Sequence, residues 1–209
     1  MVNDNTSQSS AFVISTTKTH IYSSARAWAE AFRYQRAVYL GQVLAPDFLM
    51  RLMQLCKQAR FVDDPVRGVG HRETEQSGLI SKALSLALRR SECLTWVAEL
   101  VGAHSLNTAE GCIARTCANG RDALDWHDDL NDPRRHLAIT INLSPDAYEG
   151  GQFELRNKHT KTTLFEHRHS EPGSAVLFDV SHELEHRVLP LTSGGPRCVF
   201  AGWFLETSS

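Results

Sequence analysis

Residues 174–205 read SAVLFDVSHELEHRVLPLTSGGPRCVFAGWFL, and this stretch indicates the fold most directly. It contains three short runs rich in aliphatic, β-branched and aromatic residues: Ser174–Phe178, Glu185–Leu189 and Arg197–Leu205. Each run has the length and composition of a β-strand. Proline and glycine separate the runs, above all in residues 193–196 (SGGP), which are typical of a tight turn. The stretch therefore predicts short antiparallel strands.

The same alternation of strands and turns extends back to about residue 110. Further runs of strand character are Cys112–Cys117, Leu137–Leu143, Gln152–Arg156 and Thr162–Glu166. The turn signals between the strands are Asn119-Gly120, Ser144-Pro145-Asp146, Gly150-Gly151 and Pro172-Gly173. Many short strands with such turns predict a β-sandwich or jelly roll, with its core at about residues 110–206.

The first half of the chain has a different sequence pattern. Residues 1–20 begin with MVNDNTSQSS, and we expect them to form a disordered polar tail. Between about residues 24 and 102 helical patterns dominate, which predicts helices that support the β domain. One helix is expected from Ala45-Pro46-Asp47 onward, because proline is favoured in the first turn. Another helical pattern runs from Ile80 through Leu100 and stops at Gly102.

The segment between these two helical patterns is polar and contains glycine. It reads RGVGHRETEQSG, residues 67–78, and predicts an exposed loop. Long polar loops serve either as lids over a site or as solvated connectors, and the sequence leaves both uses open. As a lid, the loop would bring Arg72 and Glu73 to the substrate side of a site.

Length and composition bound the class of protein. A chain of 209 residues with 42% hydrophobic residues predicts one soluble globular domain, at about residues 21–209. The sequence contains no run of eighteen apolar residues, so no membrane span is predicted. The N-terminus lacks the pattern of a secretory signal. A net charge of −2 gives no reason to expect nucleic acid or a membrane as partner. The sequence does not predict an oligomeric state.

The cysteines point to a reducing compartment. They form an odd, scattered set without any C-x-x-C spacing: Cys56, Cys93, Cys112, Cys117 and Cys198. Such a set argues against a disulfide framework and against a thiolate zinc site. We therefore expect the protein to lie in the cytoplasm.

A zinc-peptidase motif occurs in residues 182–186 (HELEH), which fit H-E-x-x-H. That motif binds zinc through His182 and His186 and uses Glu183 as the base, provided that all three lie on one helix. Here the motif follows a run of strand character and lies close to Pro190, which leaves little room for a helix. A zinc metallopeptidase is therefore the alternative rather than the leading interpretation.

A second metal pattern lies at residues 126–129 (WHDD). In a strand, residues two apart project to the same face, so His127 and Asp129 can converge on one ion. His186 would complete a set of two histidines and one carboxylate, which non-haem Fe(II) oxygenases use. The spacing H-x-D alone is weak, since a solvated acidic loop would show it too.

Arg197 stands on a strand whose two alternate residue sets are both largely apolar. If the set with Val199 and Trp203 faces inward, a guanidinium points into the core and requires an anionic partner. A ligand carboxylate would serve, because arginine binds one bidentately. If the other set faces inward, Arg197 is a surface residue.

Taken together, these motifs resemble the Fe(II)/2-oxoglutarate-dependent dioxygenases, specifically the prolyl-4-hydroxylase-like branch. The motifs that carry the resemblance stand in order: WHDD, LAITINLSPDAYEGGQFEL, EPGSAVLF and HRVLPLTSGGPRCVFAGWF. The match covers roughly Ile113 to Phe204, with looser agreement around Ala45–Ala59. It implies a mainly β fold with flanking N-terminal helices, whose core is a double-stranded β-helix, a variant of the jelly roll.

The resemblance also implies roles for individual residues. His127, Asp129 and His186 would bind iron, and Arg197 would hold the distal carboxylate of 2-oxoglutarate. Other residues would take secondary roles. Those expected on the cosubstrate side are Asn142, Thr140, Val188, Phe153 and Cys117. Those expected on the substrate side are Trp203, Trp126, Arg72 and Glu73.

The implied reaction is oxidation of an unactivated C–H bond, with release of succinate and CO2 and with ascorbate in support. Asp129 favours hydroxylation over halogenation, because halogenating relatives have a small residue at that position. The nucleic-acid demethylases of the superfamily lack G-G-x-x-x-L, which this chain has, so DNA and RNA are disfavoured. A protein side chain, a free amino acid and a small metabolite remain open as substrates. An inactive jelly roll used for binding is a further alternative.

Overall fold

The computed structural model describes residues 10–102 and 106–206. The helices in these segments are α1 (Arg26–Gln35), α2 (Pro46–Gln58), α3 (Leu79–Leu88) and α4 (Ser91–Val101). The strands of the N-terminal half are β1 (Phe12–Ile14), β2 (Thr19–Ile21), β3 (Ala37–Leu40), β4 (Phe61–Val66) and β5 (Gly70–Glu75). The strands of the C-terminal half are β6 (Leu106–Thr116), β7 (Ala123–His127), β8 (Arg135–Asn142), β9 (Tyr148–Gly150), β10 (Gln152–Asn157), β11 (Thr163–Arg168), β12 (Ala175–Asp179), β13 (Leu184–Val188), β14 (Leu191–Gly194) and β15 (Arg197–Glu206).

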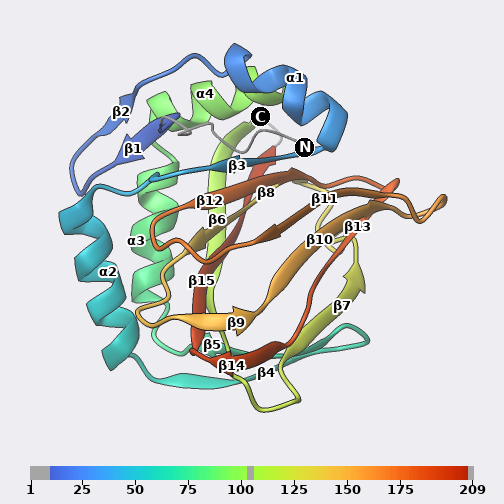
Figure 1. Cartoon of the computed structure of the whole chain (residues 1–209). Coiled ribbons are helices and arrows are strands. Elements are labelled where there is room, and N and C mark those ends of the chain that lie inside the picture. Colours follow the sequence, from blue (N-terminus) through green and yellow to red (C-terminus); the bar gives the residue numbers. More distant parts are fainter. Residues whose placement is uncertain (1–9, 103–105, 207–209) are drawn as a thin grey trace, which may run out of the picture.

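One large antiparallel sheet of 11 strands organises the described residues. Its order is β11-β10-β13-β7-β5-β6-β15-β8-β12-β3, with β4 paired to β5, while β9 and β14 form a separate pair. The sheet curls, so that β10 and β13 face β8 and β15 across an interior, and the helices cover the outer face of the second group (Figure 1). The prediction of a mainly β jelly roll with flanking helices is confirmed.

Strand β15 separates the helix-side core from the interior of the roll. It pairs with β6 on one side and with β8 on the other. Cys198, Phe200 and Phe204 are buried in the core that the helices share. The alternate set, which includes Arg197 and Trp203, lines the interior instead. Of the two orientations that the sequence left open, the structure thus has Arg197 pointing inward.

The helices follow the predicted pattern with one difference. Helix α2 begins at Pro46 as expected, and Phe48, Leu52 and Cys56 form its buried face. The pattern from residue 80 to residue 100 is divided into α3 and α4. Arg90 breaks it with an extended backbone (ψ 141°), and its guanidinium donates to the backbone carbonyl of Ser15 at 2.8 Å. None of the helices in the described segments is long and apolar enough to cross a bilayer.

The expectation of a polar tail over residues 1–20 is wrong for its second half. Strands β1 and β2 pair there as a hairpin, and Phe12 and Ile14 are fully buried. The ring of Phe12 packs edge-on against Trp96 of α4 at 5.1 Å between ring centroids. The polar residues around these strands concealed the two apolar anchors. Residues 1–9 lie outside the described segments.

A conservative pair of substitutions tests whether this hairpin belongs to the domain. Ile14→Val removes one methylene from a fully buried site and is expected to lower the free energy of unfolding by about 1 kcal/mol. The matched control is Ile21→Val on the neighbouring strand, where the side chain is 43% exposed and the effect is expected to be negligible. Urea unfolding of both variants measures the difference. Equal stability of both variants would show that the hairpin does not contribute to the core.

The expectation of an exposed loop at residues 67–78 is also wrong. Half of this segment is strand β5, which forms a hairpin with β4 and pairs with both β6 and β7 in the main sheet. In this hairpin Arg72 lies opposite Asp64 and forms an ion pair with it. A hydrophobic pair at these positions would have given a recognisable strand pattern, and the charged pair does not. Strand β3 was missed as well, because only four residues pair with the edge of β12.

Candidate metal centre

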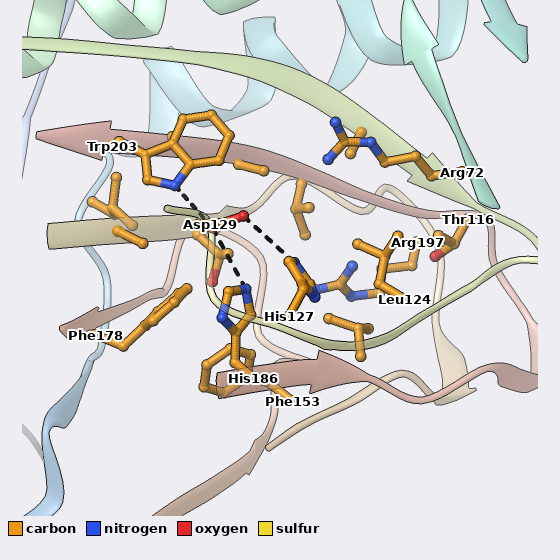
Figure 2. Close-up of a pocket in the computed structure, with 18 residues that line it drawn as sticks. Arg72, Thr116, Leu124, His127, Asp129, Phe153, Phe178, His186, Arg197 and Trp203 are labelled. Carbon is orange, nitrogen blue, oxygen red and sulfur yellow. Dashed lines mark hydrogen bonds and ion pairs between the residues drawn. The ribbon is translucent and has the colours of Figure 1, made fainter. Parts of the chain in front are cut away.

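Three potential ligands meet at one end of the interior, between β7 and β13. His127 is the last residue of β7 and lies directly opposite His186 on β13, with ring centroids 4.1 Å apart. The Asp129 carboxylate lies 3.5 Å from His127 Nε2 and 3.6 Å from His186 Nε2. Ligand atoms of all three residues lie within 4.8 Å of one another. Figure 2 shows the three side chains turned toward one another. This spacing suits a single metal ion.

Asp129 reaches the cluster by a different route from the one predicted. It does not lie in a strand with His127 but follows the end of β7, with a left-handed backbone (φ 60°). The chain turns there, and Asp128 stabilises the turn by accepting from the Leu130 amide at 3.2 Å. Asp128 points away from the cluster, as expected, and pairs with Lys158 at 2.7 Å. A local turn, not strand alternation, brings the carboxylate to the histidines.

Neighbouring groups orient the histidine and aspartate side chains. His127 Nδ1 lies 2.7 Å from the carbonyl of Asp125, so a proton on Nδ1 leaves the Nε2 lone pair directed at the cluster. Trp203 donates its indole N–H to Asp129 Oδ2 at 2.9 Å. The guanidinium of Arg135 lies 3.7 Å over the Trp203 ring and holds it in place. Such supporting contacts fix ligand geometry.

The protonation states suit metal binding at neutral pH. Burial, with a smaller contribution from His127, lowers the pKa of His186 to about 3, so its imidazole is neutral. Burial raises the pKa of Asp129, but His186, His127 and the Trp203 hydrogen bond outweigh it and hold the pKa below its ordinary value. Together with the imidazole of His127, the neutral imidazole of His186 and the carboxylate of Asp129 make up the two-histidine, one-carboxylate donor set of non-haem Fe(II) sites. The three residues therefore fit ferrous iron.

The structure contradicts the zinc-peptidase alternative. His182 and Glu183 lie in an exposed turn, and His186 lies in the middle of a strand, so the motif is not helical. Glu185, expected in the loop before the strand, also belongs to β13. Its carboxylate pairs with Arg156 at 2.7 Å, on the strand face opposite to His186. Of the two histidines in the motif, only His186 joins the cluster.

A cavity adjoins the three ligands inside the roll. Its walls are mostly apolar and come from both groups of strands. The lining residues are Arg72, Ala114, Thr116, Leu124, His127, Asp129, Ala138, Ile139, Thr140, Phe153, Phe178, His186, Val188, Arg197, Val199, Ala201, Gly202 and Trp203. A mostly apolar pocket with a few convergent polar groups is typical of a small-molecule site.

Arg197 and Thr116 form a polar pair in this otherwise apolar wall. They lie opposite each other on β15 and β6 and are 4% and 5% exposed. Among the described residues, neither Arg197 Nε nor Thr116 Oγ1 has a hydrogen-bond partner. Gly151 (φ 67°) leaves room for the arginine, because a Cβ there would lie 3.1 Å from Arg197 Cδ. Buried polar atoms without partners point to an anionic ligand at this place.

His169 lies buried behind this pair. Its Nε2 faces the carbonyl of Ser174 at 2.9 Å, while its Nδ1 has no partner among the described residues. Burial, followed by the positive charge of Arg197, lowers the pKa of His169 to about 3. A neutral imidazole can therefore lie close to the guanidinium.

The lowered pKa of His169 predicts that stability falls as the pH falls. A histidine in the unfolded chain has a pKa of about 6.5, so below that pH the unfolded state binds a proton that the folded state excludes. This group alone is expected to cost about 2 kcal/mol between pH 7 and pH 5. Urea unfolding at both pH values checks this on the metal-free protein. The variant His169→Gln should lose less stability over the interval, and an equal loss in both proteins would contradict the assignment.

Four further predicted residues line the cavity from its cosubstrate side or beside the metal ligands: Thr140, Phe153, Val188 and Trp203. Arg72 also lines it, from strand β5 rather than from a loop. Sequence reasoning missed Thr116 and Phe178. A threonine among strand residues carries no chemical signature, and only its register opposite Arg197 reveals it. Phe178 packs on His186 with ring centroids 4.6 Å apart.

Four other predicted residues do not reach the cavity. Asn142 is fully buried and uses its amide within the fold, donating to the carbonyl of His169 at 2.9 Å. Cys117 follows the end of β6, and its backbone N–H donates to Asp122. The guanidinium of Arg156 lies over the Trp126 ring, 3.5 Å from the ring centroid. Glu73, next to Arg72 on β5, instead pairs with Arg115 at 2.5 Å.

Comparisons with known proteins agree with this geometry. Residues 112–205, which include every predicted metal ligand, match the family model described as the 2OG-Fe(II) oxygenase superfamily. No curated protein matches the sequence.

Solved structures resemble the whole fold at low sequence identity. A Pseudomonas putida prolyl-4-hydroxylase is 18% identical, with a TM-score of 0.66 over 88% of this chain and 100% of that chain. A Trichoplax adhaerens prolyl hydroxylase, solved with a peptide fragment of the hypoxia-inducible factor, is 14% identical, with a TM-score of 0.64 over 87% and 89%. The epimerase SnoN from nogalamycin biosynthesis is 13% identical, with a TM-score of 0.63 over 87% and 82%.

The family match rests on the amino-acid sequence and the ligand cluster rests on the geometry, and both fall in the same segment. The match covers the β strands from β6 to β15, and the structure gathers a 2-His-1-carboxylate set within them. Enzymes of this superfamily use Fe(II), 2-oxoglutarate and O2. Over residues 112–205, the chain is similar to the 2OG-Fe(II) oxygenase superfamily.

Proposed function

We propose that the protein hydroxylates an unactivated C–H bond of a small-molecule, amino-acid or peptidyl substrate. In the overall reaction, substrate, 2-oxoglutarate and O2 become hydroxylated substrate, succinate and CO2. The observation that carries the proposal is the placement of Arg197 and Thr116 in the cavity that also holds His127, Asp129 and His186. One end of the cavity suits a metal ion, and the other suits a carboxylate.

Some side chains would bind the metal and 2-oxoglutarate, and others would exclude water. His127, Asp129 and His186 would hold ferrous iron, which supplies activation of O2 when bound. The Arg197 guanidinium would anchor the distal carboxylate of 2-oxoglutarate and so fix the direction in which the diacid lies. The apolar wall keeps water away from the reacting atoms. Trp203 keeps the Asp129 carboxylate oriented by its hydrogen bond.

We also propose a reducing compartment such as the cytosol. All five cysteines are free thiols, and three of them are buried. This arrangement is usual for proteins that are kept reduced.

Anaerobic binding tests the proposal before any substrate is known. Fe(II) and 2-oxoglutarate are added to the protein without air, and the weak visible charge-transfer band of the chelate is followed. We expect saturation at one equivalent of each component and the same result for Glu183→Gln, which lies in the exposed turn. Absence of the band in the wild type would contradict the proposal. Succinate release, screened against amino acids and peptides, then identifies the substrate.

A further inference from the structure

The cavity contains a second arginine that the proposed function does not use. Arg72 extends into the cavity from strand β5, whereas Arg197 enters from β15 (Figure 2). The distal carboxylate of 2-oxoglutarate needs one cationic anchor, and its other carboxylate would lie at the metal. Arg197 is the better anchor, because it is 4% exposed and its Nε lacks a partner among the described residues. Arg72 therefore remains for another ligand.

Arg72 is held in place along one edge only. Its Nε donates to Asp64 Oδ2 at 2.8 Å, across the β4–β5 hairpin, and its side chain is 18% exposed. Within the described segments, Asp64 is its only hydrogen-bond partner. A guanidinium has five N–H donors, so the pair of Nη groups stays available to bind a second acceptor. The ion pair with Asp64 orders the long side chain and reduces the entropy lost when a ligand binds.

The charge of this site favours a singly charged group. Asp64 pairs with Arg72, and Asp129 contributes a further negative charge from the same cavity. A carboxylate carries one negative charge, whereas a phosphate monoester carries about 1.5 to 2 at neutral pH. Much of the cavity wall is apolar, including Leu124, Val199 and Trp203. An acidic group on an otherwise apolar body matches these features.

We infer that the primary substrate is a monocarboxylic acid with an apolar body, and that the Nη groups of Arg72 bind its carboxylate. The inference rests on the proposed function and narrows its substrate class. Arg72 thereby acts as a specificity-determining residue and positions the apolar body toward the metal end of the cavity. The same carboxylate is available on a free or N-acylated amino acid.

Matched pairs of acid and amide test this assignment without turnover. The protein is loaded with Mn(II) and saturating 2-oxoglutarate, and Kd values are measured by calorimetry. The probes are N-acetyl-valine, N-acetyl-leucine, N-acetyl-proline and N-acetyl-phenylalanine, each compared with its neutral primary amide. We expect at least one acid to bind about tenfold more tightly than its amide, as a charge-assisted hydrogen bond would give. Benzoate should also bind more tightly than phenyl phosphate.

Variants assign the preference to Arg72. The acid preference should disappear in Arg72→Gln, recover in part in Arg72→Lys, and persist in the control Arg67→Gln, which lies exposed at the turn of the same hairpin. Asp64→Asn keeps an oxygen that can accept from Arg72 Nε but removes the charge that offsets the guanidinium. The preference should therefore persist or increase in this variant, even if Arg72→Gln fails to fold.

Several results would overturn the inference. They are the absence of any acid preference in the wild type, its persistence in Arg72→Gln, its loss in Asp64→Asn, tighter binding of phenyl phosphate, and displacement of the acid by additional 2-oxoglutarate. A wild type that fails to bind 2-oxoglutarate would instead overturn the proposed function, so the two failures are distinguishable.

Discussion

Replacing His186 by alanine is expected to lower the affinity for Mn(II) or Fe(II) by more than about 100-fold and to abolish 2-oxoglutarate turnover. Loss even of a group that only supports a metal ligand costs about 10- to 100-fold, and His186 would be a ligand itself. Its burial keeps it neutral at pH 7, so the wild-type imidazole is ready to bind metal without losing a proton. Calorimetric titration with Mn(II), which does not turn over, measures the affinity.

The matched control for this variant lies in the same segment. His182→Ala removes the other histidine of HELEH, whose side chain is exposed in the turn before β13. We expect wild-type metal affinity for His182→Ala. Equal losses in the two variants would favour the zinc-peptidase arrangement and contradict the cluster described above.

Replacing Arg197 by glutamine is expected to raise the Kd for 2-oxoglutarate by a factor between about 30 and several thousand. Truncating one partner of a buried, hydrogen-bonded charge pair costs about 2–5 kcal/mol, and Arg197 is 4% exposed. Metal affinity should change little, because Arg197 does not belong to the ligand cluster. Titration of the Mn(II)-loaded protein with 2-oxoglutarate measures the effect.

A shorter keto acid shows whether the lost contact is the one to the distal carboxylate. 2-Oxobutyrate lacks that group, so the wild type should strongly prefer 2-oxoglutarate, whereas Arg197→Gln should bind both about equally. The control is Arg115→Gln on the paired strand β6, where the guanidinium stacks on Phe61 at 4.1 Å. If Arg115→Gln loses affinity as well, the effect of Arg197 is not specific.

The sequence was most informative where patterns are short and repeated. Turns such as SGGP and the strands between them predict the jelly roll, because both the turn residues and the strand residues carry local signals. The β4–β5 hairpin escaped prediction, because two of its six cross-strand pairs consist of charged residues and its strands lack apolar alternation. The β1–β2 hairpin escaped because its apolar run, residues 11–14 (AFVI), is short and lies between polar segments.

In the candidate site, too, the sequence identified some residues and missed others. His127, Asp129, His186 and Arg197 have distinctive chemistry, so spacing and resemblance were enough to single them out. Thr116 could be found only from its register opposite Arg197. Asn142 was expected at the cosubstrate, but its amide is used in hydrogen bonds to His169 and Ser144. Sequence reasoning identifies reactive residue types, whereas the contacts of ordinary polar residues depend on packing.

A crystal structure of the protein with Mn(II) and 2-oxoglutarate tests the central claim most directly. Anomalous scattering should place one Mn(II) ion within about 2.0–2.4 Å of His127, Asp129 and His186. The distal carboxylate of 2-oxoglutarate should lie against Arg197 and Thr116. A metal bound to His182, or a keto acid whose distal carboxylate lies away from Arg197, would contradict the account.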